Sequence, residues 1–176
     1  MLTLIITGTP CTGKTTLARL LCKRFSCKYI DVKKIILRYR LKKGYDKKRK
    51  CKIIDEEKLA RFILKEINYL QKKISKKKFF ALIIDSHLSH YLSKEHTDLC
   101  IVTKCNLKVL ERRLKKRGYS KTKIRENLDA EIFRICHNEA LEKSHNVIVV
   151  DTVSKRSLEK LYLYLSNAKT NNRLNV

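Results

Sequence analysis

The sequence predicts an α/β fold in which helices cover both faces of a parallel sheet of five strands. Short apolar runs alternate along the chain with segments of helical periodicity, which is typical of strand–helix–strand units. Each run is apolar throughout, as expected for strands that are buried on both faces. The first run leads into GTPCTGKTT at residues 8–16, where glycines mark a tight loop before a helix. These three observations favour a doubly covered parallel sheet.

The predicted strands are bounded by turn residues or by the starts of helices. They are expected at residues 2–7, 28–31, 79–84, 99–102 and 147–150. No internal repeat or linker interrupts the 176 residues, and the sequence contains a single proline. We therefore expect one domain, with inserted segments between the strands.

The predicted helices follow from apolar spacing and from capping residues. The first carries Leu17, Leu21 and Phe25 behind the glycine loop. Five others are expected: a basic helix that ends near Gly44, one capped by Asp55, one that stops at Gly118, one capped by Ser120 that reaches Cys136, and one through Leu158, Leu161 and Leu165. The polar tail from Asn167 is expected to fray.

The composition of the chain is strongly basic. Lys and Arg number 42 against 17 Asp and Glu, which gives a formal net charge of +25. That charge favours polyanionic partners such as RNA or ribonucleoprotein, although a lysine-rich solvated surface is the simpler alternative. The seven cysteines lack C-x-x-C spacing, so we expect free thiols rather than zinc ligands or disulfides. With no long apolar segment and no signal peptide, a cytoplasmic protein is expected, nuclear if the host is a eukaryote.

The glycine loop matches the phosphate-binding pattern G-x-x-x-x-G-K-[ST] through Gly8, Gly13, Lys14 and Thr15. Backbone N–H groups of such a loop and the following helix N-terminus face an anion. In this pattern the lysine reaches the β- and γ-phosphates of ATP, and the hydroxyl after it binds Mg²⁺. A plain glycine turn between strand and helix is the alternative. The flanking strand and helix favour the P-loop interpretation.

Two polar residues follow the predicted strand at 79–84. Asp85 is placed where a carboxylate can hold Mg²⁺ or its water, and His87 is close enough to orient a water molecule or to touch the γ-phosphate. The structural alternatives are a helix or turn cap for Asp85 and a satisfied polar residue near the core for His87 and His90. We favour the functional interpretation for Asp85 and His87.

The stretch ERRLKKRGYSKTKIREN concentrates arginines around a short loop. Arginines neutralise the charge that phosphoryl transfer spreads over the γ-phosphate oxygens. Arg117, next to Gly118, is the best candidate for a mobile lid, while a basic solvated helix is the alternative for its neighbours Arg112, Arg113 and Arg125. The N-K-x-D signature of GTPases is absent, which disfavours a GTPase switch.

Four strings together give the chain a family resemblance. They are GTPCTGKTT, GYDKKRKCKIIDE at residues 44–56, IIDSH at 83–87 and RGYSKTKIRENLDAEIF at 117–133. The chain resembles the small adenylate kinase-like NTPases of ribosome biogenesis, which include the nuclear coilin-interacting type of animals and archaeal relatives. The resemblance implies a nucleoside monophosphate kinase fold. It also implies an acceptor-binding segment at about residues 31–54 and a short lid at about 116–126.

The resemblance also assigns residues to roles. It places the D-x-H motif linked to hydrolysis at Asp85 and His87, and the lid arginine at Arg117. Triphosphate contacts fall on Cys11, Gly13, Lys14, Thr15 and Thr16. Cys11 stands where relatives often have glycine. KKIILR at residues 33–38 replaces the G-D-L-x-R opening of the acceptor segment, so Asp31 and Arg38 become the acceptor-binding candidates.

The family activity implied is reversible phosphoryl transfer between a nucleoside triphosphate and a monophosphate, with broad acceptor choice and adenine preferred. The resemblance also implies Mg²⁺ with ATP as substrate and an accompanying ATPase activity. Relatives assist late small-subunit rRNA maturation by transiently holding a platform ribosomal protein, and direct rRNA contact is compatible with the basic charge. Three interpretations stay open: a nucleotide kinase, an assembly ATPase, and a nucleic-acid-binding module. We prefer a protein that is both kinase and ATPase.

Overall fold

The computed structural model describes residues 1–46, 51–73 and 79–171. Its central sheet has the strand order β2-β5-β1-β6-β7, and every neighbouring pair is parallel. The strands are β1 (Leu2–Gly8), β2 (Lys28–Asp31), β5 (Ala81–Asp85), β6 (Leu99–Lys104) and β7 (Val147–Asp151). The predicted five-stranded parallel sheet is thus confirmed, including the position of each strand.

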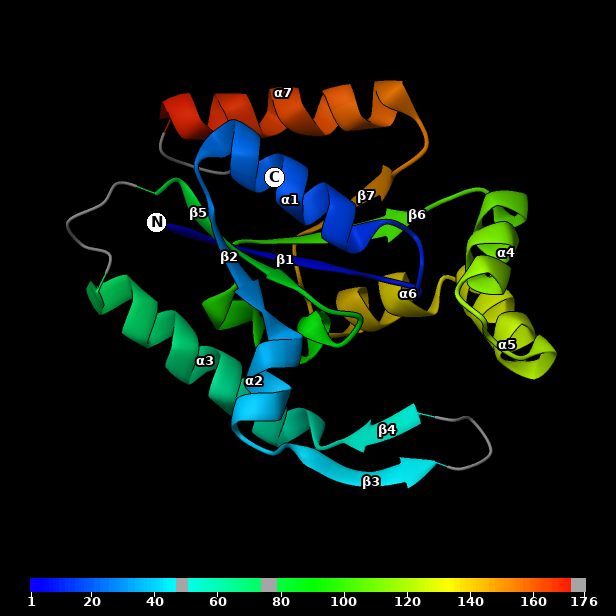
Figure 1. Ribbon diagram of the computed structural model, residues 1–176. Helices are drawn as coiled ribbons and strands as arrows, with labels where there is room; N and C mark the ends of the chain where they lie inside the picture. The colour runs from blue at the N-terminus through cyan, green and yellow to red at the C-terminus, as the bar shows by residue number, and fades with distance from the viewer. Residues whose placement is uncertain (47–50, 74–78, 172–176) are drawn as a thin grey trace.

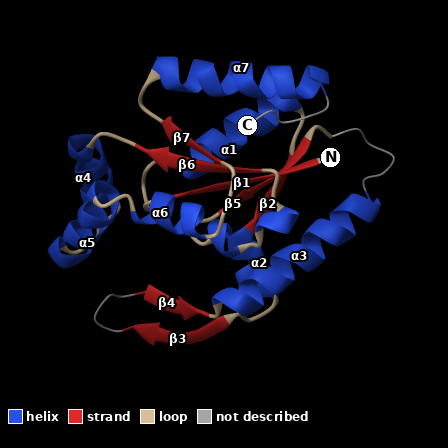
Figure 2. Cartoon of the chain, turned by 180° about the vertical axis from the view of Figure 1, so that it is seen from behind, coloured by secondary structure: helices blue, strands red, loops and turns tan. Residues whose placement is uncertain are grey.

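Helices cover both faces of this sheet (Figures 1 and 2). One face is covered by α1 (Lys14–Phe25) and α7 (Lys155–Asn171), whose Leu21 and Leu161 belong to the same buried cluster as Ile6. The other face packs Ile63 and Ala140 and is covered by α2 (Val32–Arg38), α3 (Glu56–Lys73) and α6 (Ile135–Glu142). The two buried clusters explain why the strands are apolar along their whole length.

Two further helices stand beyond the carboxyl ends of the strands (Figure 1). They are α4 (Leu107–Lys116) and α5 (Lys121–Ile132), which pack through a small cluster of Leu110, Leu114 and Ile124 around Cys105. Two short 3₁₀ turns, η1 (Ser89–Tyr91) and η2 (Lys94–His96), connect β5 to β6. The carboxyl edge of the sheet is therefore flanked by the segment in which the sequence predicts a lid.

The predicted helix caps are present. The Asp55 carboxylate accepts a hydrogen bond from the Lys58 N–H at 3.0 Å at the start of α3, and the Ser120 hydroxyl accepts one from the Lys123 N–H at 3.3 Å at the start of α5. Gly118 has a φ of +75° between α4 and α5, which is a backbone conformation that favours glycine. Among the described residues, no helix is long and apolar enough to cross a membrane.

The basic helix expected to end near Gly44 is shorter than predicted. It ends at Arg38, and a two-stranded antiparallel hairpin of β3 (Lys42–Asp46) and β4 (Cys51–Ile54) follows. Arg40 takes the left-handed conformation with φ +51°, and Leu41 is buried, so the chain reverses direction here. Lysine-rich sequence without apolar periodicity carries no signal that distinguishes a short helix from an exposed hairpin. The predicted acceptor segment includes residues 47–50, which lie outside the described residues.

The helix expected from Ser120 to Cys136 is two helices. The break falls at Arg134, which has φ +52°, and leaves Phe133 65% exposed. The turn lets α6 run back under the sheet, where Ala140 is fully buried. The last helix also continues past Asn167 to Asn171, because Ala168 is buried against the core. The rest of the predicted tail, residues 172–176, lies outside the described part.

Candidate active site

The glycine loop joins β1 to α1 and is held from three sides. An added Cβ on Gly8 would lie 2.4 Å from the carbonyl oxygen of Thr103, so the loop needs glycine where it leaves the sheet. The Thr12 hydroxyl donates to the Thr9 carbonyl at 2.8 Å and lies 2.7 Å from the Thr103 hydroxyl. Thr152, just after β7, donates to the Thr12 carbonyl. These bonds fix the bend whose amides face an anion.

Lys14 begins α1, and its ammonium folds back over the loop. It donates to the carbonyl oxygens of Gly8 at 2.7 Å and Thr9 at 2.9 Å. Burial lowers the pKa of Lys14, whereas the nearby Cys136 thiol and Asp85 carboxylate act in the opposite direction. The ammonium therefore lies at the mouth of the loop, where the motif places the phosphates of a nucleotide.

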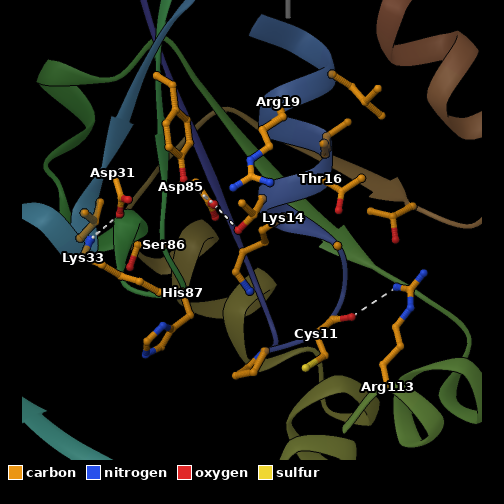
Figure 3. A pocket seen from close by; sticks show the side chains of 18 of the residues that line it. Cys11, Lys14, Thr16, Arg19, Asp31, Lys33, Asp85, Ser86, His87 and Arg113 are labelled. Atoms are coloured by element: carbon orange, nitrogen blue, oxygen red, sulfur yellow. Dashed lines mark hydrogen bonds between the residues drawn. The ribbon is translucent and has the colours of Figure 1, made fainter. Parts of the chain in front are cut away.

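The Asp85 carboxylate, which Figure 3 labels, lies at the end of β5. Thr15 Oγ1 donates to Asp85 Oδ2 at 2.5 Å, and the phenol of Tyr29 donates to the same oxygen at 3.1 Å. Burial raises the pKa of Tyr29, and the Asp85 charge adds to the effect, so the phenol remains a donor at neutral pH. Tyr29 thus fixes a carboxylate that already contacts the first helical turn after the loop.

The pair formed by Thr15 and Asp85 fits a magnesium ion that is shared with nucleotide phosphates. Both groups offer hard oxygen ligands, and Mg²⁺ in nucleotide sites is held by one or two protein oxygens, substrate phosphates and water. Among the described residues, no cluster of three or more His, Cys, Asp or Glu side chains is arranged to hold a metal ion.

His87 projects into the cleft from the turn after β5 (Figure 3). Part of His87 remains exposed to solvent, while the walls of the cleft shield the rest from water. Desolvation in the cleft lowers the pKa of His87 to about 4, with a further contribution from the Lys14 charge that outweighs the opposite effect of Asp85. The imidazole is therefore neutral at physiological pH, and a neutral imidazole can accept a proton from water or hydrogen-bond to it.

Two arginines approach the loop, Arg113 from α4 and Arg117 from the predicted lid. Arg113 Nη1 donates to the carbonyl oxygen of Cys11 at 3.3 Å, and Arg117 Nη1 contacts the Cys11 sulfur at 3.6 Å. Cys11 itself has φ +70°, a backbone conformation that favours glycine. Both arginines therefore contact the loop at Cys11.

A cleft of about 650 Å³ contains most of the predicted site residues. Its lining includes Cys11, Gly13, Lys14, Thr15, Thr16, Asp31, Asp85, His87 and Arg117. Arg38 is not among the lining residues, and it forms an ion pair with Glu66 of α3 at 3.3 Å. His90 is buried behind the cleft and is only 1% exposed. The structure thus brings together every predicted site residue except Arg38.

Several lining residues lack any prediction from the sequence: Arg19, Tyr29 and Lys33. Arg19 lies four residues after Thr15, so helical periodicity could have placed it on the same face. Tyr29 precedes Asp31 by two positions, which puts both on one side of strand β2. Lys33 follows the helix cap Asp31, whose carboxylate accepts from the Lys33 N–H at 3.0 Å. Within the described part of the chain, the charged ends of Arg19 and Lys33 have no hydrogen-bond or ion-pair partner.

Together, a parallel sheet, a glycine loop before α1 and an adjacent Thr–Asp pair define a P-loop protein of the kinase type. Residues 4–134 match the family model described as an AAA domain. The chain is 37% identical over 163 residues to the adenylate kinase isoenzyme 6 homolog of Schizosaccharomyces pombe, which covers 93% of this chain and 87% of that protein. It is 38% identical over 151 residues to a Pyrococcus furiosus protein provisionally named an adenylate kinase, covering 85% and 74% respectively.

A solved structure extends the likeness to the fold. A sugar kinase from Janibacter superposes with a TM-score of 0.62 at 16% identity, and the match covers 97% of each chain. With these matches, the chain belongs to the adenylate kinase-like family of P-loop proteins. The protein is therefore a nucleotide kinase-like enzyme.

Proposed function

We propose that the protein transfers a phosphoryl group reversibly between ATP and a nucleoside monophosphate, with AMP as the main acceptor. The observation that carries the proposal is the Thr15–Asp85 pair, which lies beside the phosphate loop in a cleft with cationic walls on both sides. Such a cleft can hold two phosphorylated substrates with their phosphate groups facing each other. Phosphoryl transfer depends mainly on positioning and charge neutralisation, which these groups supply.

The donor side of the cleft is assigned to the phosphate loop and the lid. Lys14 and the loop amides hold the β- and γ-phosphates of ATP, with Cys11, Gly13 and Thr16 along the loop. Thr15 and Asp85 would hold Mg²⁺, which when bound neutralises phosphate charge. Arg117, on the lid, contacts the loop at the Cys11 sulfur and is assigned to neutralise the charge of the transferred group. Lid closure then excludes water from the donor site.

The acceptor side is assigned to the start of α2. Asp31 and Arg38 are the residues expected from the sequence, and Lys33 and Arg19 are the cations that line the cleft there. An acceptor phosphate that binds between Lys33 and Arg19 would lie near Asp85 and opposite Lys14. We therefore assign the acceptor phosphate to Lys33 and Arg19, with Arg38 recruited only if its ion pair with Glu66 opens.

The test of transfer is direct. Purified protein incubated with Mg²⁺, ATP and AMP is expected to form ADP, as followed by chromatography of the nucleotides. Lys14→Ala should abolish the reaction, whereas Lys23→Ala, at an exposed position on the same helix, should leave it unchanged. Product formation that does not depend on AMP would contradict the kinase assignment.

We also propose an ATPase activity that uses His87. A neutral imidazole near the Asp85 carboxylate can orient water toward the γ-phosphate when the acceptor is absent. His87→Ala should lower hydrolysis more than transfer, and His96→Ala, at an exposed histidine outside the cleft, serves as the matched control. Equal losses of both activities would argue against a water-positioning role.

For the cell, we propose that the protein assists late maturation of the small ribosomal subunit through transient binding of a platform ribosomal protein. Family resemblance and the net charge of +25 support this role, and contact with rRNA is compatible with both. Affinity capture of small-subunit proteins with and without ATP tests it, because nucleotide should change the captured set. RNA affinity that falls steeply with salt and ignores ATP would favour a nucleic-acid-binding module instead.

A further inference from the structure

A buried histidine lies behind the phosphate loop and has no role in the assignments above. His90, on η1, has its Nδ1 atom 2.8 Å from the hydroxyl of Thr7. Thr7 is fully buried and directly precedes Gly8, the first residue of the loop motif. Neither His90 nor Thr7 lines the main cleft. His90 therefore contacts the strand that leads into the loop and not a bound substrate.

The other side of the ring faces an acidic residue of α6. His90 Nε2 lies 3.0 Å from Glu139 Oε2, although the pair is not aligned as a hydrogen bond. The His90 carbonyl oxygen lies 3.0 Å from Nε2 of His145, which anchors the backbone of the same turn. Burial lowers the pKa of His90 to about 4, with the neighbouring His145 and Lys143 adding to the effect. The imidazole is therefore neutral and carries a single N–H.

That single proton has a preferred position. We assign the N–H to Nε2 on electrostatic grounds, because an ionised carboxylate 3.0 Å away repels a bare ring nitrogen and attracts a protonated one. Nδ1 then lacks a proton, so in its 2.8 Å contact with Thr7 the hydroxyl is the donor. The same hydroxyl proton also faces the His87 carbonyl oxygen at 3.4 Å, which is the longer of the two contacts. Glu139 thereby selects the tautomer that makes this bond possible.

The turn that carries His87 is attached to β1 at neighbouring points. The Ser86 N–H donates to the Ile6 carbonyl at 3.2 Å, and the Ser89 hydroxyl donates to the same oxygen at 3.0 Å. The bond between His90 and Thr7 is the attachment nearest to the phosphate loop along β1. The His87 carbonyl oxygen lies 3.4 Å from the Thr7 hydroxyl. Shifts of the His90 ring would therefore move His87 relative to the loop.

We propose that His90 is a positioning residue: by accepting the Thr7 hydroxyl, it holds the turn that bears His87 in place beside the phosphate loop. Glu139 supports it by fixing the ring tautomer. The inference rests on the proposed function, in which His87 orients water for ATP hydrolysis. A displaced His87 would slow the chemical step and leave the grip of the loop on ATP largely intact.

Two substitutions separate the two ring nitrogens. Asparagine places a polar atom near the Nδ1 position, whereas glutamine places one near the Nε2 position. His90→Asn should keep kcat for ATP hydrolysis within about threefold, because an acceptor for Thr7 remains. His90→Gln should lower kcat by about tenfold or more and change KM for ATP by less than about threefold. Thr7→Val removes the hydroxyl that contacts both His90 and the His87 carbonyl, so it should lower kcat at least as much as His90→Gln.

Controls make the outcome decisive. His96→Asn, at an exposed histidine, should behave as wild type. Thermal melts identify any His90 variant that fails to fold, and the Thr7→Val variant is then measured in its place. Nitrogen-15 spectra of wild-type His90 should show a protonated Nε2 and a bare Nδ1. The opposite tautomer, a fully active His90→Gln, or equal losses with asparagine and glutamine would each overturn the inference. Absence of hydrolysis in wild type would instead remove the proposed function.

Discussion

Lys33 and Arg38 lie five positions apart in the short helix α2, yet their side chains have different surroundings. Lys33 lines the main cleft, whereas Arg38 is paired with Glu66 of α3 and lies outside the cleft lining. The Arg38 side chain is 61% exposed, so its pairing contributes little to stability. Position along α2, and not charge alone, decides which cation is available to an acceptor phosphate.

A pair of substitutions tests this assignment at the level of single residues. Lys33→Ala should raise KM for AMP by about tenfold or more, because a hydrogen bond to a charged group contributes about 1.5–3 kcal/mol. Arg38→Ala, the matched control, should change KM for AMP by less than about threefold. Steady-state kinetics with ATP at saturation measures both, and a larger effect at Arg38 would reverse the assignment.

Titration of His90 gives a prediction for stability. Its pKa is about 4 in the folded protein, below the value of about 6.5 for an unperturbed histidine. Between these values the unfolded chain binds more protons, so stability falls as the pH falls from about 6.5. From about pH 6.5 to pH 5 the loss should approach 2 kcal/mol for this group. Urea unfolding should show a shallower pH dependence for His90→Asn, and equal slopes would contradict the shift.

The residues of the site differ in how far sequence predicts them. Lys14, Thr15 and Asp85 are encoded by a short motif and by the end of an apolar strand, so local sequence places them together. Tyr29 and Arg19 enter the cleft through contacts across elements, and such contacts leave no mark in a local pattern. Arg38 is drawn away by Glu66, a residue of another helix. Contacts between residues of different elements are therefore what the sequence alone does not predict here.

Among the secondary-structure elements, the five strands of the central sheet could be predicted from the sequence, whereas the segments that connect them could not. The five strands of the sheet are buried on both faces, and continuous apolar runs report that burial directly. The hairpin β3–β4 and the break between α5 and α6 depend on single left-handed residues, Arg40 and Arg134. An arginine in the sequence does not predict a positive φ, because the residues that favour this conformation are glycine and asparagine.

The phosphate loop offers a prediction about an element. Gly8→Ala should destabilise the protein by about 3 kcal/mol or more, because the new Cβ meets the Thr103 backbone and the residue has φ +135°. Gly44→Ala is the matched control, since its Cβ would make only ordinary contact with Ile53 at 3.5 Å. Chemical unfolding of both variants measures the difference. A Gly8→Ala protein as stable as wild type would show that β1 and β6 can separate at this point.

At the scale of the whole molecule, charge is the dominant property. A net charge of +25 on 176 residues opposes compaction through self-repulsion. The sites that bind phosphate use part of this charge, as the cleft lined by Lys14, Arg19 and Lys33 illustrates. Much of the remainder lies on exposed side chains, where it favours polyanions in general and specifies none.

Salt should therefore stabilise the isolated protein. Raising NaCl from about 0.01 M to about 0.1 M shortens the Debye length from roughly 30 to 10 Å, which screens repulsion between exposed cations. The melting temperature should rise by a few degrees, with about 3 °C for each kcal/mol at this chain length. A variant with Lys23, Lys28 and Lys160 each changed to Glu, all exposed and outside the cleft lining, should show a smaller rise. An unchanged melting temperature in wild type would contradict dominant self-repulsion.

The bond from Thr152 to the Thr12 carbonyl has a consequence for biosynthesis. The loop motif leaves the ribosome long before the threonine that braces it, because that threonine follows β7. A nascent polypeptide that has emerged only as far as α6 lacks this brace. Competence to grip a nucleotide should therefore arise late in translation, after the final strand has joined the sheet.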